Sequence, residues 1–596
     1  MTTYTAPIND FKFVLNDVVG LDRYANLPGF EEVSPDLVDA ILEEAGKVAS
    51  EVLHPINQSG DLEGCHWDDG VVTTPKGFKE AYDLYVESGW GSLTAKTEHG
   101  GQGLPQTIAI MVSEMMIAAN WGFTMYPGLT KSAVEALDAH ASDELKERYL
   151  ANMVSGKWTG TMNLTEPHCG TDLGMIRTKA DPQADGSYRI SGTKIFISAG
   201  EHDLSENIIH LVLAKIPGGP AGTKGISLFL VPKFLVKDDG SLGARNGVSC
   251  GSIEHKMGIH SNATCVMNYD EATGYLVGEV NRGMPAMFTM MNEARLWVGI
   301  QGLGIAEVAH QNAVAYARDR LQGRAISGPK NADGPADPII VHPDVRRMLM
   351  TGRAFTEGAR AMAAIAGLQI DLVHHHPDEA VRQKADDYVA LMTPVIKAYF
   401  TDMGVDVASL AVQTWGGHGF IQDNGVEQFL RDSRIAPIYE GTNGIQAMDL
   451  VGRKLGMNGG RAIQAFFAEV GQFIAENKSD PVLGPLVAEL EKALGRQQQA
   501  TMWLMQNGLA KPDNAGAAAS DYLRLMALVA MGHVWGMMAK AAQTRLAEGA
   551  DNPAFYEYKL VTARFFFDRL LPDTGSLLKK IESGSESLMA LPADAF

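Results

Sequence analysis

The stretch RDSRIAPIYEGTNGIQ at residues 431–446 is the most informative part of this chain. It places one carboxylate, Glu440, between an apolar run and Gly441, which permits a tight turn. Asn443, with Gln446 three residues later, has the pattern of a helix N-cap. We therefore expect Glu440 to project from a short loop with buried flanks. Partial burial raises the pKa of a carboxyl and makes it a usable proton acceptor near neutral pH. An ordinary loop glutamate is the alternative.

The composition narrows the class of protein. A chain of 596 residues can bury a large core and should divide into several domains. The net charge of −21 argues against a nucleic-acid or anionic-membrane partner, since either would repel it. The four cysteines have no CxxC spacing, so neither a zinc site nor a disulfide scaffold is indicated. The N-terminus does not resemble a secretory signal and no apolar run is long enough to span a bilayer, so we expect a cytoplasmic protein.

Hydrophobic periodicity divides the chain into five segments. An N-terminal extension, residues 1–36, carries scattered aromatic residues that should pack on a surface. Helical periodicity predicts a helical N-terminal domain over 37–155, and alternation of period two predicts a β domain over 156–280. Long helices over 281–457 predict a helical bundle domain that carries the Glu440 stretch as its catalytic loop. Residues 458–596, rich in Ala and Met, predict an appended helical domain for packing or oligomerisation.

Three local features are also predicted. One helix should occupy the region from Ala133 to Tyr149. Another should run from about Ala380 to Trp415, interrupted by Pro394. The stretch 323–343 is rich in Gly, Pro and Asp, which predicts an inserted loop.

Five separated motifs follow one another in a fixed order. They are LTEPHCGTD at 164–172, GTKIFIS at 192–198, RLQGR at 320–324, QTWGGHGF at 413–420, and the stretch around Glu440. The glycine clusters at 100–103 and 416–419 do not fit GxGxxG, and GxxxxGK[ST] does not occur in the sequence. With these motifs in this domain order, the chain resembles the acyl-CoA dehydrogenase family over about residues 37–455.

The resemblance implies a fold that is mainly α with a central β domain. The parts are a helical N-terminal domain, a β-barrel-like middle domain and a four-helix-bundle domain, here with an added C-terminal helical domain. It also implies a non-covalent FAD between the β domain and the second helical domain, with the glycines allowing close backbone approach. The residues that it assigns to FAD are Met162, Leu164, Thr165, Gly170, Thr171, Phe196, Ile197, Ser198, Arg320, Gln322, Gln413, Gly416, Gly417, Thr442 and Gly444. Taken singly, Thr165 or Ser198 is more often an ordinary strand hydroxyl, and the pair Gly416-Gly417 is usually part of a loop.

Arg320 and Gln322 would reach the FAD pyrophosphate of a neighbouring subunit, which implies a homodimer or a dimer of dimers. Two positions depart from the family pattern. The family shows Arg-x-x-Phe-Gly where this chain has Arg320-Leu321-Gln322-Gly323, one residue shorter. The glutamine that is common two residues after the glycine-threonine pair is Gly444 here, so one flavin contact lacks its usual side chain.

The resemblance makes Glu440 the catalytic base. Removing a proton beside a thioester carbonyl needs a carboxylate of raised pKa, and the enolate charge needs hydrogen-bond donors. By resemblance these donors are the Glu440 N–H and a flavin ribityl hydroxyl. Some members place the base at the position of Ala294; Glu293 is adjacent, but one residue turns a helix by about 100°. The residues assigned to substrate are Thr171, Asn292, Arg295, Tyr439 and Gly441.

The predicted activity is FAD-dependent α,β-dehydrogenation of a short acyl-CoA, with electrons passed to an electron-transfer flavoprotein. The architecture resembles a long subgroup of the family, which suggests 3-(methylsulfanyl)propanoyl-CoA as substrate. A dehydrogenase for straight short- or medium-chain acyl-CoA and an acyl-CoA oxidase are alternatives within the enzymes. A DNA-associated flavoprotein of the same fold is an alternative of another class, disfavoured by the net charge. No metal site is predicted, since the run His374–His376 lacks partner ligands at suitable spacing.

Overall fold

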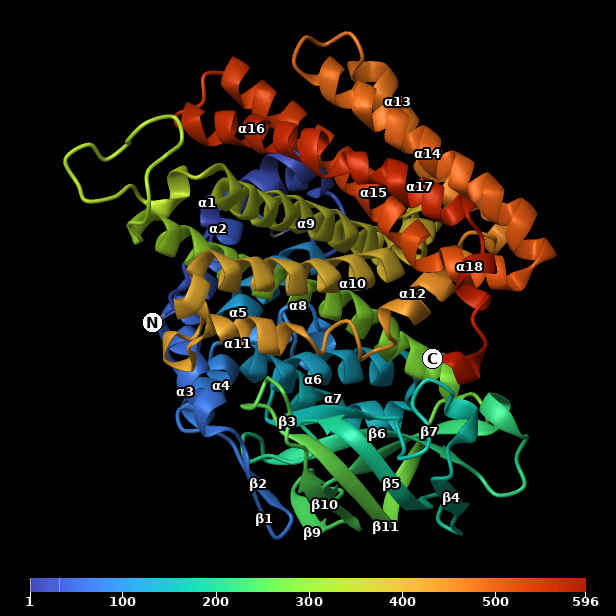
Figure 1. Ribbon diagram of the computed structural model, residues 1–596. Helices are drawn as coiled ribbons and strands as arrows, with labels where there is room; N and C mark the ends of the chain where they lie inside the picture. Colours follow the sequence, from blue (N-terminus) through green and yellow to red (C-terminus); the bar gives the residue numbers. More distant parts are fainter. Residues whose placement is uncertain (1, 32) are drawn as a thin grey trace. The chain divides into compact units, whose positions relative to one another are not determined.

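The longest helices among the described residues of the computed structural model are α8 (Gly283–Asp319) and α10 (Glu379–Trp415), of 37 residues each (Figure 1). The structure describes residues 2–31 and 33–596, apart from the side chains at 292 and 293. Its contacts form two compact units. The helical unit comprises Met1–Gly46, Pro105–Ala118 and Val298–Phe596, and the sheet unit comprises Lys47–Leu104 and Ala119–Trp297.

The helical unit consists of long helices that pack against one another. Its helices, besides most of α8 and all of α10, are α1 (Ile8–Lys12), α2 (Pro35–Lys47), α5 (Gln106–Ala119), α9 (Pro343–His375), α11 (Val426–Ser433), α12 (Asn443–Asp449), α13 (Arg461–Asn477), α14 (Leu483–Ala510), α15 (Pro512–Ala547), α16 (Pro553–Arg569), α17 (Thr574–Glu582) and α18 (Glu586–Met589). Helix α15 packs against α9, α10, α12, α14, α16 and α17. Among the described helices, α15 alone is long and apolar enough to cross a membrane. However, 83% of its most apolar stretch is buried inside the protein, as in a core helix.

The sheet unit contains a seven-stranded sheet. Its elements are α3 (Asn57–Glu63), β1 (His66–Asp68), β2 (Val71–Thr73), α4 (Phe78–Glu87), α6 (Trp121–His140), α7 (Asp143–Val154), β3 (Trp158–Asn163), β4 (Lys179–Pro182), β5 (Tyr188–Ser198), β6 (Asn207–Lys215), β7 (Ile226–Pro232), β8 (Phe234–Val236), β9 (Leu242–Arg245), β10 (Val248–Ile253) and β11 (Thr264–Val277). The strand order is β10-β11-β5-β4-β6-β3, and β7 pairs with both β11 and β6. Strand β7 is buried throughout and β6 up to its last residue, which explains their unbroken apolar sequences.

The predicted fold class is confirmed, and several local predictions need correction. The single helix expected over Ala133–Tyr149 is wrong: α6 and α7 meet at Ser142, whose hydroxyl accepts from the Leu145 N–H at 3.4 Å and starts a new helix. Helix α10 continues through Pro394 instead of being interrupted there. The predicted domain boundaries stay predictions.

The N-terminal extension packs as its aromatic residues suggested. Phe11, Phe13 and Phe30 are buried. Its first residues are held on α8 by two side-chain amides: Asn312 donates to and accepts from the backbone of Thr3, at 2.8 and 3.0 Å, and Gln311 does the same with Thr5. These amides replace a neighbouring strand as partners of an extended backbone.

The predicted inserted loop is ordered by one carboxylate. Asp337 accepts hydrogen bonds from the backbone N–H groups of Ala325, Asn331 and Lys330, at 2.8, 2.7 and 2.9 Å. The bond from Ala325, with those from the other two residues, lowers the pKa of Asp337 to about 2. The loop is therefore held in one conformation at neutral pH although it contains little regular structure.

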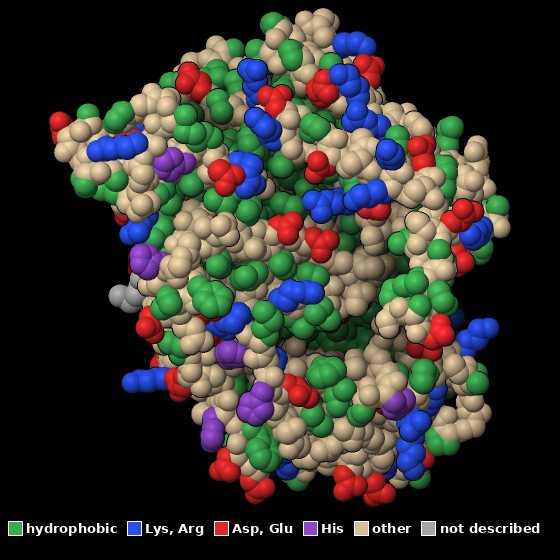
Figure 2. All heavy atoms as spheres, viewed as in Figure 1, with side chains coloured by type: hydrophobic (Ala, Val, Ile, Leu, Met, Phe, Trp, Pro, Cys, Tyr) green, Lys and Arg blue, Asp and Glu red, His purple; other side chains and the backbone are tan. Residues whose placement is uncertain are grey.

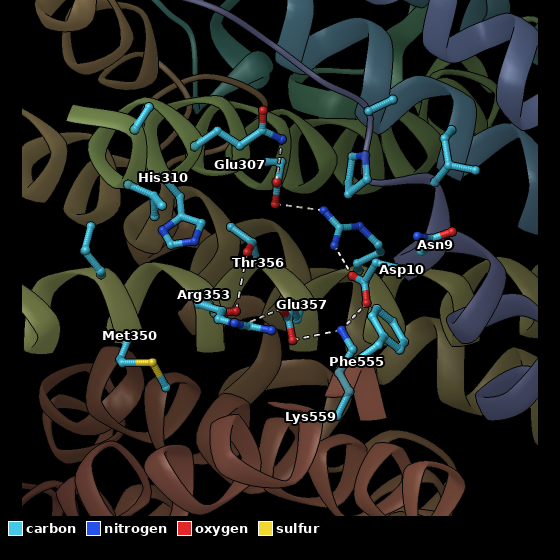
Figure 3. Close-up of a pocket in the computed structure, with 18 of the residues that line it drawn as sticks. Asn9, Asp10, Glu307, His310, Met350, Arg353, Thr356, Glu357, Phe555 and Lys559 are labelled. Atoms are coloured by element: carbon cyan, nitrogen blue, oxygen red, sulfur yellow. Dashed lines mark hydrogen bonds and ion pairs between the residues drawn. The ribbon is translucent and has the colours of Figure 1, made fainter. Parts of the chain in front are cut away.

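A buried charge network connects the extension, the bundle and the C-terminal helices of the helical unit (Figure 3). At its centre Arg360 of α9, 1% exposed, donates to Glu114 at 2.9 Å, to Glu307 at 2.9 Å and to Asp10. Lys559 of α16 pairs with the same Asp10. Burial raises the pKa of Glu114 to about 7, because the partial compensation from Arg360 is weaker. Burial also opposes ionisation of Asp10, but Lys559 and Arg360 outweigh it and hold its pKa below the usual value.

Candidate functional site

Residues 434–442, which we call the Glu440 loop, connect α11 to α12. The loop begins with a tight turn in which the Tyr439 N–H donates to the Ile435 carbonyl at 3.1 Å. Glu440 then adopts a left-handed backbone, with φ of +57°, and Gly441 follows at +84°. A non-glycine residue there costs of the order of 1–3 kcal/mol, and such strain is concentrated at functional sites. The sequence motif did not reveal this conformation.

Two buried side chains of the helical unit donate hydrogen bonds to backbone carbonyls of the Glu440 loop. Lys397 of α10 donates from Nζ to the Gly441 carbonyl at 2.9 Å and to Asn443 Oδ1 at 2.8 Å. Gln446 donates from Nε2 to the carbonyls of Glu440 and Gly441, both at 3.2 Å. Hydrogen bonds to a charged group contribute about 1.5–3 kcal/mol, enough to offset the strain at Glu440. Lys397 and Gln446 were not among the predicted site residues.

The predicted N-cap is wrong by one residue. The Thr442 hydroxyl accepts from the Ile445 N–H at 3.3 Å, so Thr442 caps α12. Asn443 is the first residue of the helix, and its side chain donates to α10, at 2.7 Å to Asp402 Oδ1 and at 3.1 Å to the Ala398 carbonyl. Asn443 therefore attaches the loop to α10 while Thr442 starts the helix.

The expectation of buried flanks is also wrong in part. Ala436 is buried, but Ile438 is 48% exposed and Glu440 is half-buried. The reason is the tight turn: both the Ile438 and Tyr439 N–H groups donate to the Ile435 carbonyl, as in a helical turn, where successive side chains are rotated by about 100° and so point to different surroundings. Tyr439 points to α8, where its hydroxyl donates to Gln301. An apolar side chain exposed beside a carboxylate is suited to contact with an apolar ligand.

In the sheet unit, a buried lysine fixes the first motif. Lys194 of β5, fully buried, donates to the Leu164 carbonyl and to Glu166 Oε1, both at 2.9 Å. The Ile195 N–H donates to the Thr165 carbonyl at 3.0 Å. A lysine within an apolar strand pattern was the signal that could have identified this support. Thr165, which follows the end of β3, is thereby held by β5.

The residues assigned to FAD in the sheet unit differ in exposure. Phe196 is 60% exposed with a left-handed φ of +60°, and Ser198, two residues later, is half-buried. Ile197 and Leu164 are buried, so their side chains belong to the core. The remaining residues of this set lie at the surface: Met162 and Thr165 are half-buried, and Gly170 and Thr171 are exposed.

The residues assigned to FAD in the helical unit are accessible. Gln413, Gly416 and Gly417 are exposed at the end of α10. Gly416 has φ of +58°, and a Cβ built on either glycine would meet no atom within 4 Å, so a ligand can approach the backbone there. The other residues of this set, Arg320, Gln322, Thr442 and Gly444, are also exposed.

The C-terminal end of α10 is held rigid by an aromatic contact. Tyr316 of α8 stacks on Trp415 with ring centroids 4.4 Å apart, and its hydroxyl lies 2.7 Å from His418 Nδ1. The Trp415 indole N–H donates to the Asn312 carbonyl at 3.1 Å. The glycines between Trp415 and His418 are therefore anchored on both sides.

Among the residues assigned to substrate, Tyr439 and Gly441 lie together in the Glu440 loop, and Thr171 is exposed in the sheet unit. Arg295 is buried. The side chains of Asn292 and of the rival base, Glu293, lie outside the described residues.

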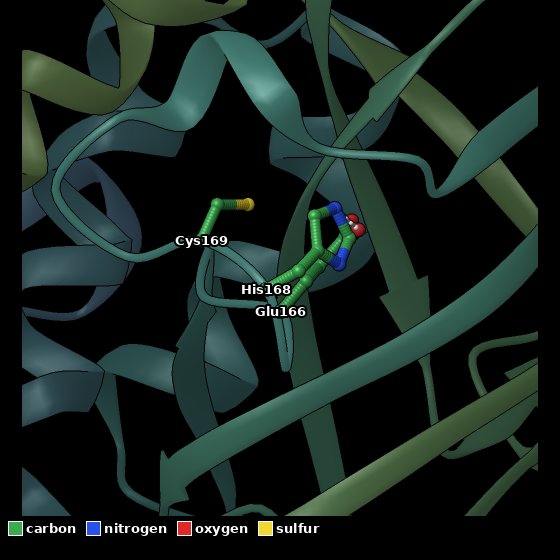
Figure 4. Close-up of side chains that lie close together, drawn as sticks. All are labelled: Glu166, His168 and Cys169. Carbon is green, nitrogen blue, oxygen red and sulfur yellow. Dashed lines mark ion pairs between the residues drawn. The ribbon is translucent and has the colours of Figure 1, made fainter.

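Glu166, His168 and Cys169 lie close together, in an arrangement that could suggest a metal site (Figure 4). His168 Nε2 is 3.7 Å from Glu166 Oε2 and donates to the Met175 carbonyl at 2.9 Å. The Glu166 carboxylate already accepts from Lys194, from Thr178 and from the Arg177 N–H. Burial raises the pKa of the Cys169 thiol. The three groups are better explained as support for the 164–172 motif.

The Glu166–Lys194 pair leads to a pH-dependent prediction. Burial raises the pKa of Glu166, but Lys194 and hydrogen bonds from Thr178 and Arg177 outweigh it and hold this pKa below its usual value. At neutral pH, Glu166→Gln should lower the free energy of unfolding by about 1.5–3 kcal/mol. Because the folded-state pKa is lowered, this contribution is full above the unfolded-state pKa of about 4.3 and is lost as the pH falls through the folded-state pKa.

Urea unfolding of wild type and Glu166→Gln at a series of pH values from about 7 down to about 3 measures this difference. The difference should shrink on acidification. A difference that stays constant or grows would show that the ionised carboxylate does not support the sheet unit.

Comparisons with known proteins cover nearly the whole chain. Family models match as "Acyl-CoA dehydrogenase, N-terminal domain" over residues 38–157, "Acyl-CoA dehydrogenase, middle domain" over 161–272, "Acyl-CoA dehydrogenase, C-terminal domain" over 281–455, and "Acetyl-CoA dehydrogenase C-terminal like" over 466–592.

Two curated relatives and one solved structure are similar over their full lengths. The 3-methylmercaptopropionyl-CoA dehydrogenase of Ruegeria pomeroyi is 43% identical, covering 98% of this chain and 99% of the relative. A butyryl-CoA dehydrogenase of Syntrophomonas wolfei is 35% identical, covering 100% and 99%. The crystal structure of Caenorhabditis elegans ACDH-11 in complex with C11-CoA has a TM-score of 0.77 at 20% identity and covers 96% of this chain and 92% of that chain, a likeness of fold.

Proposed function

Since the chain belongs to the acyl-CoA dehydrogenase family, we propose that it oxidises 3-(methylsulfanyl)propanoyl-CoA to its 2-enoyl-CoA, with Glu440 removing the α-proton. The protein is an FAD-dependent oxidoreductase of the acyl-CoA dehydrogenase class, and the family resemblance inferred from five motifs is confirmed. The proposal adds the substrate, the base and the partners.

The substrate proposal rests on similarity over the whole chain. The relative named for 3-methylmercaptopropionyl-CoA is 43% identical, and the relative named for butyryl-CoA is 35% identical, each over nearly all of both chains. Both names specify a short acyl group. A straight short-chain acyl-CoA is therefore the second candidate substrate.

The observation that supports the proposed role of Glu440 is its strained backbone, in a loop to which two buried side chains donate hydrogen bonds. A left-handed glutamate, fixed by Lys397 and Gln446 and flanked by the exposed Ile438, combines preorganisation with an apolar neighbour that excludes water. A carboxylate covered by an acyl chain loses hydration, which raises its pKa toward the value that proton abstraction needs. We assign the Glu440 N–H to the thioester oxygen, where enolate charge develops.

The described residues fit an FAD. The exposed ring of Phe196, beside the half-buried Ser198, offers a flat apolar surface, and Gly416 and Gly417 leave room for a ligand against the backbone. In the sheet unit, Thr165 and Ser198 would contact a flavin ring. In the helical unit, Gln413 and the two glycines would contact an adenosine group. The bound FAD supplies the acceptor for the hydride that leaves the β-carbon.

We also propose an electron-transfer flavoprotein as the electron acceptor, a homodimer or dimer of dimers in which Arg320 and Gln322 serve the FAD of a neighbouring subunit, and a cytoplasmic location. A DNA-associated flavoprotein is disfavoured by the net charge of −21. On the face drawn in Figure 2, acidic and basic side chains are intermixed.

The test is anaerobic titration of the purified protein with a panel of acyl-CoA thioesters, following flavin absorbance. We expect 3-(methylsulfanyl)propanoyl-CoA to reduce the flavin with the highest ratio of rate to dissociation constant, and butyryl-CoA to be slower. A higher ratio for butyryl-CoA would reassign the substrate. Failure of every acyl-CoA to reduce the flavin would refute the proposed activity.

A further inference from the structure

Lys397 lies in the middle of α10 and its side chain is fully buried. An ammonium group withdrawn from water is retained where hydrogen-bond acceptors replace the water. Here the acceptors belong to the Glu440 loop and the start of α12: the Gly441 carbonyl at 2.9 Å and Asn443 Oδ1 at 2.8 Å. The cation is therefore directed at the residue that follows the proposed base.

The second acceptor of Lys397 is itself immobilised. The Asn443 amide donates to Asp402 Oδ1 at 2.7 Å, to Thr401 Oγ1 at 3.0 Å and to the Ala398 carbonyl at 3.1 Å, all on α10. The Asn443 Oδ1 is thereby directed at Lys397, which lies on α10 next to Ala398 and one turn before Thr401. The ammonium position is set by α10, which is a rigid element, and not by the loop that it holds.

Lys397 and Gln446 together fix two successive peptide planes. Gln446 donates to the carbonyls of Glu440 and Gly441, and Lys397 donates to the second of these. A trans peptide is planar, with its C=O and N–H on opposite sides. With both carbonyls turned toward these donors, the N–H groups of Gly441 and Thr442 face the other way, and Gly441, which lies between the two planes, is kept at φ of +84° directly after Glu440.

We propose that Lys397 is a positioning residue for the reaction: by holding the Gly441 carbonyl it keeps the turn at Gly441 in the conformation from which Glu440 aims its carboxylate at the α-carbon. This inference rests on the proposed role of Glu440 as the base. Lys397 acts through the loop and does not touch the substrate. Its three donors on a flexible stem suit two separated acceptors, whereas the planar fork of arginine suits a single carboxylate.

The test compares Lys397→Met with wild type in single-turnover flavin reduction by the acyl-CoA that the panel identifies as best. Misplacement of a catalytic group by about 1 Å can cost about 100-fold in rate. We expect the reduction rate per bound flavin to fall about 10- to 100-fold, with the acyl-CoA dissociation constant changed less than about 3-fold. Deuterium at the substrate α-carbon should slow the variant more than wild type, because proton removal becomes the limiting step.

Lys384→Met is the matched control, since Lys384 lies on the same helix with an exposed side chain paired to Glu469 at 3.1 Å. It should behave as wild type. If Lys397→Met does not fold, Gln446→Met removes two donors from the same carbonyls and should show the same loss of rate without loss of affinity. A wild-type rate and isotope effect per bound flavin in the folded variants, with only thermal stability reduced, would overturn the positioning role.

Measuring Glu440→Gln in parallel distinguishes a failure of the positioning role of Lys397 from a failure of the proposed role of Glu440 as the base. If Glu440→Gln is inactive while Lys397→Met reduces its flavin at the wild-type rate, the positioning role fails and the base assignment stands. If Glu440→Gln is fully active, the proposed function of Glu440 fails and the positioning role fails with it.

Discussion

Replacement of Glu440 by Gln should lower the rate of flavin reduction by an acyl-CoA by about 10²–10⁴-fold, the usual contribution of a positioned general base. Glutamine has the same shape and keeps the backbone N–H, but it cannot accept the α-proton at neutral pH. Stopped-flow mixing with the acyl-CoA measures the rate. FAD content should equal that of wild type, since the loss concerns the base alone.

Glu293→Gln is the control for this prediction, because Glu293 is the rival base in the sequence. It should reduce its flavin at nearly the wild-type rate. The assignment is contradicted if Glu293→Gln is inactive and Glu440→Gln is active.

Replacement of Arg360 by Met should destabilise the helical unit by about 3–5 kcal/mol, the effect of removing one partner from a buried ionic group. Arg360 donates to Asp10, Glu114 and Glu307, so its loss leaves three carboxyl groups buried close together. Only Asp10 then retains a cation among the pairs described here, Lys559. Urea unfolding followed by circular dichroism gives the change in free energy.

Arg347→Met serves as the matched control on the same helix, because Arg347 is exposed and pairs with Asp344 at 2.8 Å. An exposed pair contributes about 0–1 kcal/mol, so this variant should unfold almost as wild type does. Equal effects of the two substitutions would show that the network contributes no more than a surface ion pair.

Much of the fold was predictable from the sequence because it follows from local pattern. The change from helical period to alternation near residue 156 located the β domain, and the apolar runs of β6 and β7 are buried as expected for central strands. Helix boundaries were less predictable. The division between α6 and α7 depends on one capping serine, Ser142, which apolar periodicity alone does not reveal.

The candidate site was predictable where residues are adjacent in sequence and not where they are distant. The motif around Glu440 is local and was identified. Its support comes from Lys397, 44 residues before the carbonyl that it holds, and only the packing of α10 against the loop brings them together. The charge network around Arg360 has the same origin, since Asp10 lies 350 residues away. For Lys397, a lone charged residue in an apolar stretch of α10 was the available signal.

The most direct test of the central claim, that Glu440 removes the α-proton while the β-hydride leaves, is reduction of the wild-type protein by an acyl-CoA deuterated only at the α-carbon. The account predicts a slower reduction than with unlabelled substrate, and a rate for Glu440→Gln that is about 10²–10⁴-fold lower than for wild type with either substrate. Reduction of Glu440→Gln at the wild-type rate with an unchanged isotope effect would contradict it, because another group would then be removing the proton.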